Sequence, residues 1–256
     1  MISKNRIKYI QSLQTKKMRD EEQLYLIEGA KLVNAYLHSG IRLKFLAALP
    51  EYIDLLSPRE KASIDEIETA SIKDLDRMSG LKTPHNAIAV VSFPVGLPDP
   101  MKITGSMLIA LESVQDPGNL GTIIRAAAWF GFGYIVCSLN CADVYNPKVI
   151  QASMGALLNV TVCSHDLLHL LDEARKKEVP VYGTYLEGVS VYESKPGNKG
   201  IILFGNESRG ISDDLIPFIT TRLLIPKFTS STHGVESLNV GMAASVIFSE
   251  FARRRG

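Results

Sequence analysis

Short apolar runs alternate with helical patterns in the second half of the chain, and this alternation constrains the fold more than any other feature. The apolar runs predict strands at 107–111, 134–137, 160–163, 179–185, 201–204 and 222–225. Helices are predicted at 120–130, 147–158, 167–177, 213–219 and 238–254. Strands that are apolar throughout are typical of a parallel sheet covered on both faces. We therefore expect an α/β domain that binds ligands in loops at the carboxyl ends of its strands.

A proline-rich segment separates this part from the rest of the chain. Phe93–Pro100 contains three prolines and a glycine, which excludes a helix interior or a central strand. Ahead of it, short strands are predicted at 23–27, 43–49 and 87–93 and helices at 30–38 and 71–78, which indicates a small α/β domain. We expect domains at 1–95 and 106–256, joined by a linker at 96–105.

The basic residues are unevenly distributed, although the net charge is only +1. The first 19 residues contain no acid and six basic side chains: Lys4, Arg6, Lys8, Lys16, Lys17 and Arg19. Such a segment can bind phosphates. The alternative is a solvated helix face.

Several common sites and locations are excluded by what the sequence lacks. It contains neither the dinucleotide fingerprint G-x-G-x-x-G, nor the phosphate loop, nor the G-x-S-x-G elbow. The five histidines are scattered, and the three cysteines fit neither a zinc site nor a disulfide framework, so no metal is expected. No apolar window is long enough to span a membrane, and the first residues lack the apolar core of a signal peptide. We expect a cytoplasmic protein without a membrane partner.

Two segments that follow predicted strands contain polar residues suited to a binding site. Asp116–Arg125 starts at a Pro-Gly turn, where Asn119 is the expected helix cap, and Arg125 shares a helix face with Trp129. Phe204–Gly210 leads an apolar strand into a glycine-bounded loop that contains Glu207. Such loops offer backbone groups to a ligand. The alternatives are a plain capped helix and an ordinary connection.

A third segment starts at Ile225–Pro226 and opens the last helix at Glu236–Val240. Ser237 is its expected cap, and the helix N-terminus would direct positive charge at a ligand. A buried helix with a serine cap is the alternative.

Together, and in this order, the three segments resemble the motifs of the SpoU (TrmH-type) branch of the SPOUT methyltransferases. The resemblance extends over residues 106–252. The N-terminal part is similar to the SpoU substrate-binding domain through Asn5, Lys8, Arg19 and Glu28–Gly29.

The resemblance implies a fold, a cofactor and an activity. The C-terminal domain would contain a trefoil knot, an exception to the usual absence of knots. The chain would be a homodimer with active sites at its interface, and it would methylate RNA ribose 2′-hydroxyls with S-adenosylmethionine. By motif position, the catalytic residues would be Asn119, Arg125, Glu207, Ser237 and Asn239. The cofactor would contact Gly205, Ile225 and Leu238, joined by Thr184.

Two positions depart from the family pattern. Ser208 stands where many members have glycine, and Lys227–Val235 is longer and more polar than the expected turn. That stretch either covers the cofactor or contacts RNA.

The role of Arg125 stays open between two mechanisms. The family's arginine has been assigned as the base, but a free guanidinium gives up its proton only far above neutral pH. A charged Arg125 that stabilises the developing alkoxide costs less free energy, and the proton would then go to Glu207 or to water.

The RNA substrate is predicted only by class. The N-terminal domain, with Lys16, Lys17 and Arg19 as its RNA contacts, favours ribosomal RNA over transfer RNA. An antibiotic-resistance rRNA methylase would have the same architecture. The alternatives are a tRNA ribose methyltransferase, an RNA-binding protein that has lost catalysis and, less close, a nucleotide-binding enzyme.

Overall fold

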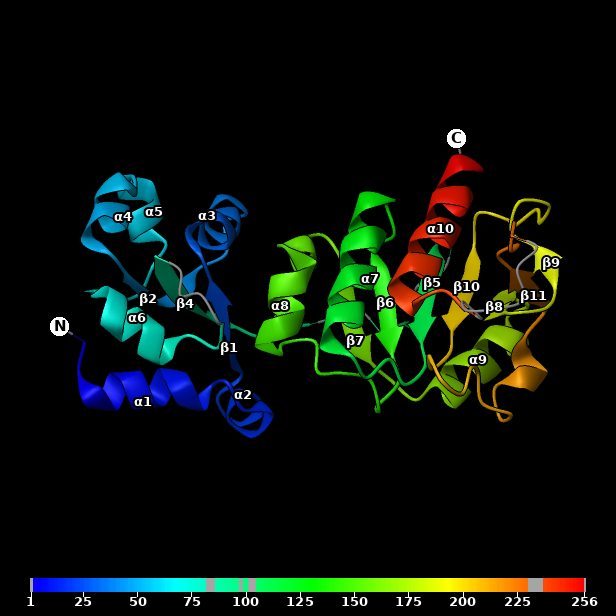
Figure 1. The fold of residues 1–256 in the computed structure, drawn as a ribbon, viewed down its shortest axis with the longest axis horizontal. Helices are drawn as coiled ribbons and strands as arrows, with labels where there is room; N and C mark the ends of the chain where they lie inside the picture. Colours follow the sequence, from blue (N-terminus) through cyan, green and yellow to red (C-terminus); the bar gives the residue numbers. More distant parts are fainter. Residues whose placement is uncertain (1, 82–85, 97–98, 101–104, 230–236, 256) are drawn as a thin grey trace. The chain divides into compact units, whose positions relative to one another are not determined.

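The computed structural model describes residues 2–81, 86–96, 99–100, 105–229 and 237–255, in two compact units (Figure 1). The first unit comprises residues 1–95 and 143–158, and the second comprises 96–142 and 159–256. Residues 143–158, which the sequence placed in the catalytic domain, thus pack with the N-terminal unit. Most of the polar stretch 227–235 lies outside the described residues.

A four-stranded sheet in the order β1-β4-β2-β3 forms the centre of the first unit. Its strands are β1 (Leu24–Glu28), β2 (Leu43–Ala48), β3 (Ile67–Thr69) and β4 (Ala87–Ser92). β4 is antiparallel to β1 and β2, whereas β2 and β3 are parallel. The helices are α1 (Lys4–Ser12), α2 (Lys16–Glu22), α3 (Ala30–His38), α4 (Pro50–Leu55), α5 (Pro58–Ala62), α6 (Ile72–Met78), α8 (Pro147–Ser153) and the 3-10 turn η2 (Ala156–Leu158).

The two faces of this sheet are buried by different helices, because successive strand residues point to opposite sides. Leu26, Ile88 and Val90 pack with side chains of α1 and α6. Ile27, Ala87 and Ala89 pack on the other face with α3 and α4, and Ile150 of α8 lies in the same cluster. The α8 segment therefore completes the core of the first unit.

A seven-stranded sheet in the order β7-β6-β5-β10-β8-β11-β9 forms the second unit, and every pair of neighbours is parallel. The strands are β5 (Met107–Leu111), β6 (Tyr134–Cys137), β7 (Thr161–Ser164), β8 (Val181–Tyr185), β9 (Val189–Ser190), β10 (Gly200–Phe204) and β11 (Thr221–Leu224). The helices are α7 (Pro117–Trp129), α9 (Leu167–Lys176), α10 (Val240–Arg253) and the 3-10 turn η3 (Ile216–Phe218). The parallel α/β architecture predicted from the alternation is confirmed.

Helices cover both faces of this sheet. α7 and α10 lie side by side on one face, where Phe204 of β10 meets Phe248 of α10 (Figure 1). Their close contact depends on Gly241, because a Cβ there would lie 3.0 Å from Cγ2 of Thr122. On the other face, α9 packs against residues such as Ala110 and Leu203.

Helix boundaries differ from the sequence-based prediction where the backbone turns. The helix expected over 147–158 stops at Ser153, because Met154 and Gly155 have φ of 52° and 87°. The helix expected over 213–219 is reduced to the 3-10 turn η3. No helix in the described part of the chain is long and apolar enough to cross a membrane. Among these same residues, no group of three or more His, Cys, Asp and Glu side chains would hold a metal ion.

Candidate functional site

The three sequence segments singled out above follow strands of the second sheet and meet at one edge. They come after β5, β10 and β11, and β8 lies between β10 and β11 in the sheet. Because these strands are parallel, their carboxyl ends lie at the same edge, where ligands of such sheets bind. Thr184, near the end of β8, belongs to this edge as well.

Asp116, and not Asn119, caps the N-terminus of α7. Its Oδ1 accepts a hydrogen bond from the Asn119 N–H at 2.8 Å, and Pro117 occupies the first turn, where no N–H is needed. The predicted cap at Asn119 is therefore wrong by one turn. As a consequence, the Asn119 carboxamide is available for other contacts.

Asn239, and not Ser237, caps α10. Its Oδ1 accepts hydrogen bonds from the N–H groups of Gly241 at 3.0 Å and Met242 at 3.3 Å. Since the oxygen is used by the helix, the amide nitrogen of Asn239 points to the opposite side. Ser237 is exposed and lies ahead of the cap.

Asn119, Glu207 and Asn239 form one hydrogen-bonded cluster. The Asn239 Nδ2 donates to Asn119 Oδ1 at 2.9 Å and lies 3.5 Å from Glu207 Oε1. The Asn119 Nδ2 in turn donates to Glu207 Oε1. Capping of α10 thus fixes the carboxamide of Asn239, which in turn orients that of Asn119. Both carboxamides direct an N–H group at Oε1 of Glu207.

Glu207 lies at the tip of a tightly closed loop. The N–H of Asn206 donates to the Gly210 carbonyl at 2.9 Å, and the N–H of Gly210 donates back to the Asn206 carbonyl at 2.8 Å. A Cβ on Gly205 would lie 2.2 Å from the Gly210 carbonyl carbon, so only glycine fits there. Glu207, Ser208 and Arg209 are consequently held outward and exposed.

The remaining predicted catalytic residues lie outside this cluster. Arg125 is exposed on α7, and no ion pair links it to another residue of the described chain. It shares a helix face with Trp129, whose side chain is 84% exposed. The hydrogen bonds of the Glu207 carboxylate within the described part of the chain come from Asn119 and Asn239, and Ser237 donates none. Three of the five predicted catalytic residues are thus brought together.

The predicted cofactor residues share this edge of the sheet. Gly205 follows β10, Ile225 follows β11, and Thr184 lies opposite the buried Leu223 in the β8–β11 pairing. Leu238, next to the Asn239 cap, is 46% exposed and presents apolar surface. Their contact with a cofactor remains a prediction.

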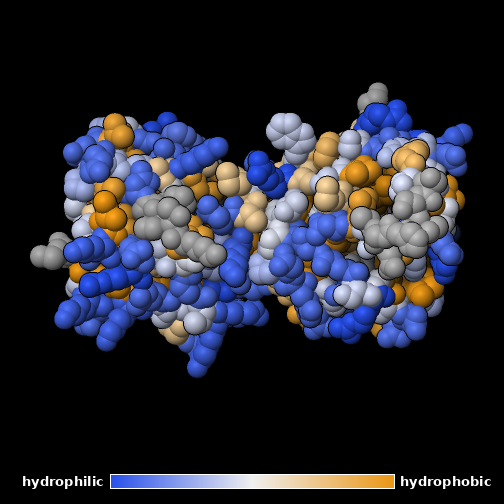
Figure 2. Space-filling view, in the orientation of Figure 1, coloured by the Kyte–Doolittle hydropathy of each residue, from blue (hydrophilic) through white to orange (hydrophobic). Residues whose placement is uncertain are grey.

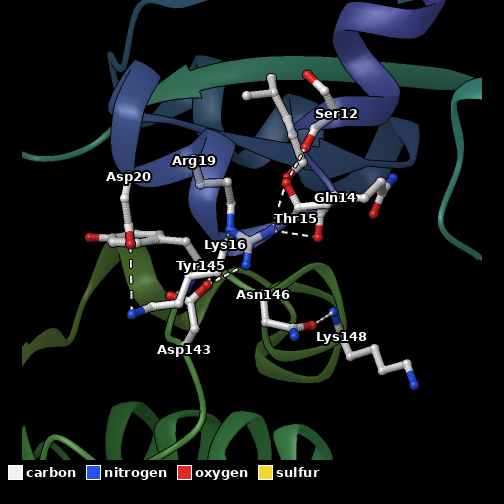
Figure 3. Close-up of polar contacts among 11 residues, drawn as sticks. Ser12, Gln14, Thr15, Lys16, Arg19, Asp20, Asp143, Tyr145, Asn146 and Lys148 are labelled. Carbon is white, nitrogen blue, oxygen red and sulfur yellow. Dashed lines mark hydrogen bonds and ion pairs between the residues drawn. The ribbon is translucent and has the colours of Figure 1, made fainter.

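The prediction that Arg19 contacts RNA is contradicted by its burial, because only 1% of the residue is exposed. Its guanidinium is directed at neighbouring protein atoms (Figure 3). Its guanidinium donates to the carbonyls of Leu13 at 2.9 Å and Gln14 at 2.8 Å, and it forms an ion pair with Asp143. All three guanidinium nitrogens therefore donate to protein atoms. Arg19 fastens the 143–158 segment to the N-terminal unit.

Lys16 and Lys17 remain at the surface of the first unit. Their side chains are 67% and 82% exposed and lie 3.7 and 3.8 Å from the acids Asp20 and Glu21. Hydrophilic side chains cover most of the surface over α1 and α2 (Figure 2). These exposed ion pairs are weak, so both lysines stay available to a phosphate.

Sequence reasoning assigned no role to two residues that support this site. Asn206 holds the Glu207 loop, and Ser113 has a left-handed backbone with a φ of 53°. An asparagine directly before Glu207 was visible in the sequence. Nothing local to Ser113 indicates its backbone conformation.

Comparison with known proteins identifies the family to which a site of this geometry belongs. The model of the SpoU rRNA methylase family matches residues 106–249, and that of the MRM3-like substrate binding domain matches residues 4–89. A 23S rRNA (guanosine(2553)-2′-O)-methyltransferase of Bacillus subtilis is 29% identical over 94% of this chain and 94% of its own.

Solved structures match both units of the chain. A TrmH-family protein from Porphyromonas gingivalis is 38% identical, with a TM-score of 0.86 over 99% of each chain. An rRNA methyltransferase from Sinorhizobium meliloti, solved with bound AdoMet, is 25% identical, with a TM-score of 0.85 over 100% of this chain and 96% of that one. The chain belongs to the SpoU rRNA methylase family.

Proposed function

We propose that this protein transfers a methyl group from S-adenosylmethionine to a ribose 2′-hydroxyl of ribosomal RNA. The observation that carries the proposal is the cluster of Asn119, Glu207 and Asn239 at the ligand-binding edge of a SpoU-family sheet. Its residues come from the first turn of α7, the loop after β10 and the N-cap of α10. The Bacillus subtilis relative is named for this reaction on 23S rRNA, and it aligns with both units.

The residues at this edge fit S-adenosylmethionine, which when bound supplies an electrophilic methyl group on its sulfonium. Gly205 leaves no space for a side chain, and the loop after it is closed by peptide groups. Such a loop suits a ligand that is held by backbone N–H and C=O groups. The exposed side chain of Leu238 offers apolar surface for a purine ring. Thr184 and Ile225 complete the predicted cofactor contacts.

The ribose hydroxyl must lose its proton during methyl transfer, and Glu207 and Arg125 have different roles in this step. Both amide contacts of Glu207 go to Oε1, so Oε2 is the oxygen that takes the proton, directly or through water. Asn119 and Asn239 hold the carboxylate in place. Arg125 stabilises the developing oxyanion with its cationic guanidinium. Ser237, two residues ahead of the Asn239 cap of α10, completes the set of proposed catalytic residues.

Ribosomal RNA is favoured over transfer RNA because of the first unit. The Bacillus subtilis rRNA enzyme aligns with 94% of this chain, whereas a structure described for 2-OH methylation of C/U34 on tRNA covers 61%. The extra unit supplies RNA affinity through exposed lysines such as Lys16 and Lys17.

A homodimer completes the proposal. Trp129 on α7 and Met242 on α10 are 84% and 62% exposed, and a second copy would cover this apolar surface. The active sites would lie at that interface, and the second unit would contain the family's trefoil knot. The protein would act in the cytoplasm, where its RNA substrate is available.

The test is transfer of labelled methyl groups to purified RNA. We expect label from S-adenosylmethionine in unmodified rRNA, little in tRNA, and none with Glu207→Ala. Transfer to tRNA alone would select the tRNA enzyme instead. If neither RNA is labelled and calorimetry detects no cofactor binding, the chain is an RNA-binding protein without catalysis.

A further inference from the structure

Ser113 stands directly behind the Glu207 loop in an unusual backbone conformation. It follows β5, and its φ of 53° lies in the left-handed region that non-glycine residues rarely adopt. Its N–H donates to Ser138 Oγ at 2.9 Å, and its carbonyl accepts from Asn206 Nδ2 at 2.8 Å. The residue is thus held from both sides. Strained residues of this kind cluster at functional sites.

Asn206 connects this fixed point to the loop that presents Glu207. Its Oδ1 accepts from the N–H groups of Ser208 at 3.0 Å and Arg209 at 3.2 Å, while its Nδ2 reaches Ser113. A single carboxamide therefore ties the backbone after Glu207 to the end of β5. An ordinary asparagine turn needs only the oxygen contacts. The bond from Asn206 Nδ2 to the Ser113 carbonyl is therefore not required to form the turn.

We propose that the Asn206–Ser113 hydrogen bond is a strut that positions Glu207 for the reaction, so that Asn206 is a positioning residue. Asn119 and Asn239 orient the Glu207 carboxylate from the α7 and α10 sides. The strut fixes the backbone from which that side chain projects. Without it, the loop keeps its internal bonds and the pairing of β10 with β5, but its Asn206 side chain loses the link to the Ser113 carbonyl. This inference rests on the role proposed above for Glu207.

The substitution Asn206→Asp removes the hydrogen bond to Ser113 and keeps the bonds that form the turn. Aspartate keeps an oxygen for the Ser208 and Arg209 N–H groups, but it cannot donate to the Ser113 carbonyl. A misplacement of about 1 Å can cost about a hundredfold in rate, so we expect kcat to fall by at least about tenfold. The Kd for S-adenosylmethionine should stay within about twofold, and the melting temperature should be unchanged. Asn146→Asp, the same change at the cap of α8, is the matched control and should keep full kcat.

A double-mutant cycle tells a positioning role from a structural one. If Asn206 acts through Glu207, adding Asn206→Asp to Glu207→Gln should cause no further loss of kcat. Wild-type kcat in Asn206→Asp, or losses that add fully in the double variant, would overturn the strut. Full activity of Glu207→Gln alone would instead overturn the proposed role of Glu207, so the two failures are distinguishable.

Discussion

Replacing Arg19 by methionine should destabilise the first unit instead of removing a surface contact with RNA. The Arg19 side chain is 2% exposed, and its ion pair with Asp143 joins α2 to the 143–158 segment. Methionine replaces the aliphatic part of the side chain but has no guanidinium, so it leaves Asp143 without its cation and two backbone carbonyls without donors. The substitution thus removes the polar contacts and keeps most of the aliphatic packing.

The expected loss follows from the burial of the pair. Removing one partner of a buried ion pair costs about 3–5 kcal/mol. The Asp143 side chain is 14% exposed and recovers some hydration, so we expect about 3 kcal/mol. With a urea m-value of about 2 kcal/mol/M, the unfolding midpoint of the first unit should fall by about 1.5 M.

Near-UV circular dichroism in urea measures this change. The packed rings of Tyr25, Phe93 and Tyr145 report on the first unit, whereas the single tryptophan, Trp129, lies in the second. Lys17→Met, on the same helix but 82% exposed, is the control and should unfold like wild type. If Arg19→Met also unfolds like wild type and only RNA affinity falls, the reasoning from burial is refuted.

Substitutions at three further positions, Gly205, Arg125 and Glu250, test other parts of the account. Gly205→Ala places a Cβ 2.2 Å from a backbone carbon and should weaken S-adenosylmethionine binding at least about tenfold by calorimetry. The control is Gly133→Ala, whose added Cβ has no atom within 4 Å, and it should bind S-adenosylmethionine like wild type. Equal affinities of the two variants would contradict the closed loop at Gly205. Arg125→Ala should abolish methyl transfer and keep the affinity for S-adenosylmethionine. Arg125→Lys should also be nearly inactive, because the point charge of an ammonium lacks the planar, forked donors of a guanidinium. Wild-type turnover of either variant would contradict the role of Arg125. Hydrogen bonds from Arg253 and Arg254 lower the pKa of Glu250 to about 2, below its unfolded value, so Glu250 stabilises the fold above about pH 4.5. The melting-temperature deficit of Glu250→Gln at pH 7 should therefore shrink as the pH falls toward 2, and a constant deficit would exclude this ion pair.

The parallel sheet and the loops of the site were predictable because local patterns determine them. Buried parallel strands have to be apolar, and their carboxyl ends have to share an edge. The caps were not predictable, because asparagine, aspartate and serine cap helices about equally well. Asn119 and Asp116 are both suitable. The choice depends on Glu207, 88 residues away, which takes the Asn119 amide.

The environment of Arg19 was equally hidden from the sequence. In the chain it belongs to a run of basic residues, but its partner Asp143 lies 124 residues away. The same long-range packing moves 143–158 into the first unit, where Ile150 fills the core. Helical periodicity predicts that such a segment has an apolar face, but it does not say which sheet the face covers.

The position of the transferred methyl group tests the central claim most directly. Unmodified rRNA is incubated with the protein and methyl-labelled S-adenosylmethionine, and the RNA is then hydrolysed in alkali. A methylated 2′-oxygen cannot attack the neighbouring phosphate, so the account predicts that the label is recovered in alkali-resistant dinucleotides. Label in mononucleotides would mean methylation of a base and would contradict it.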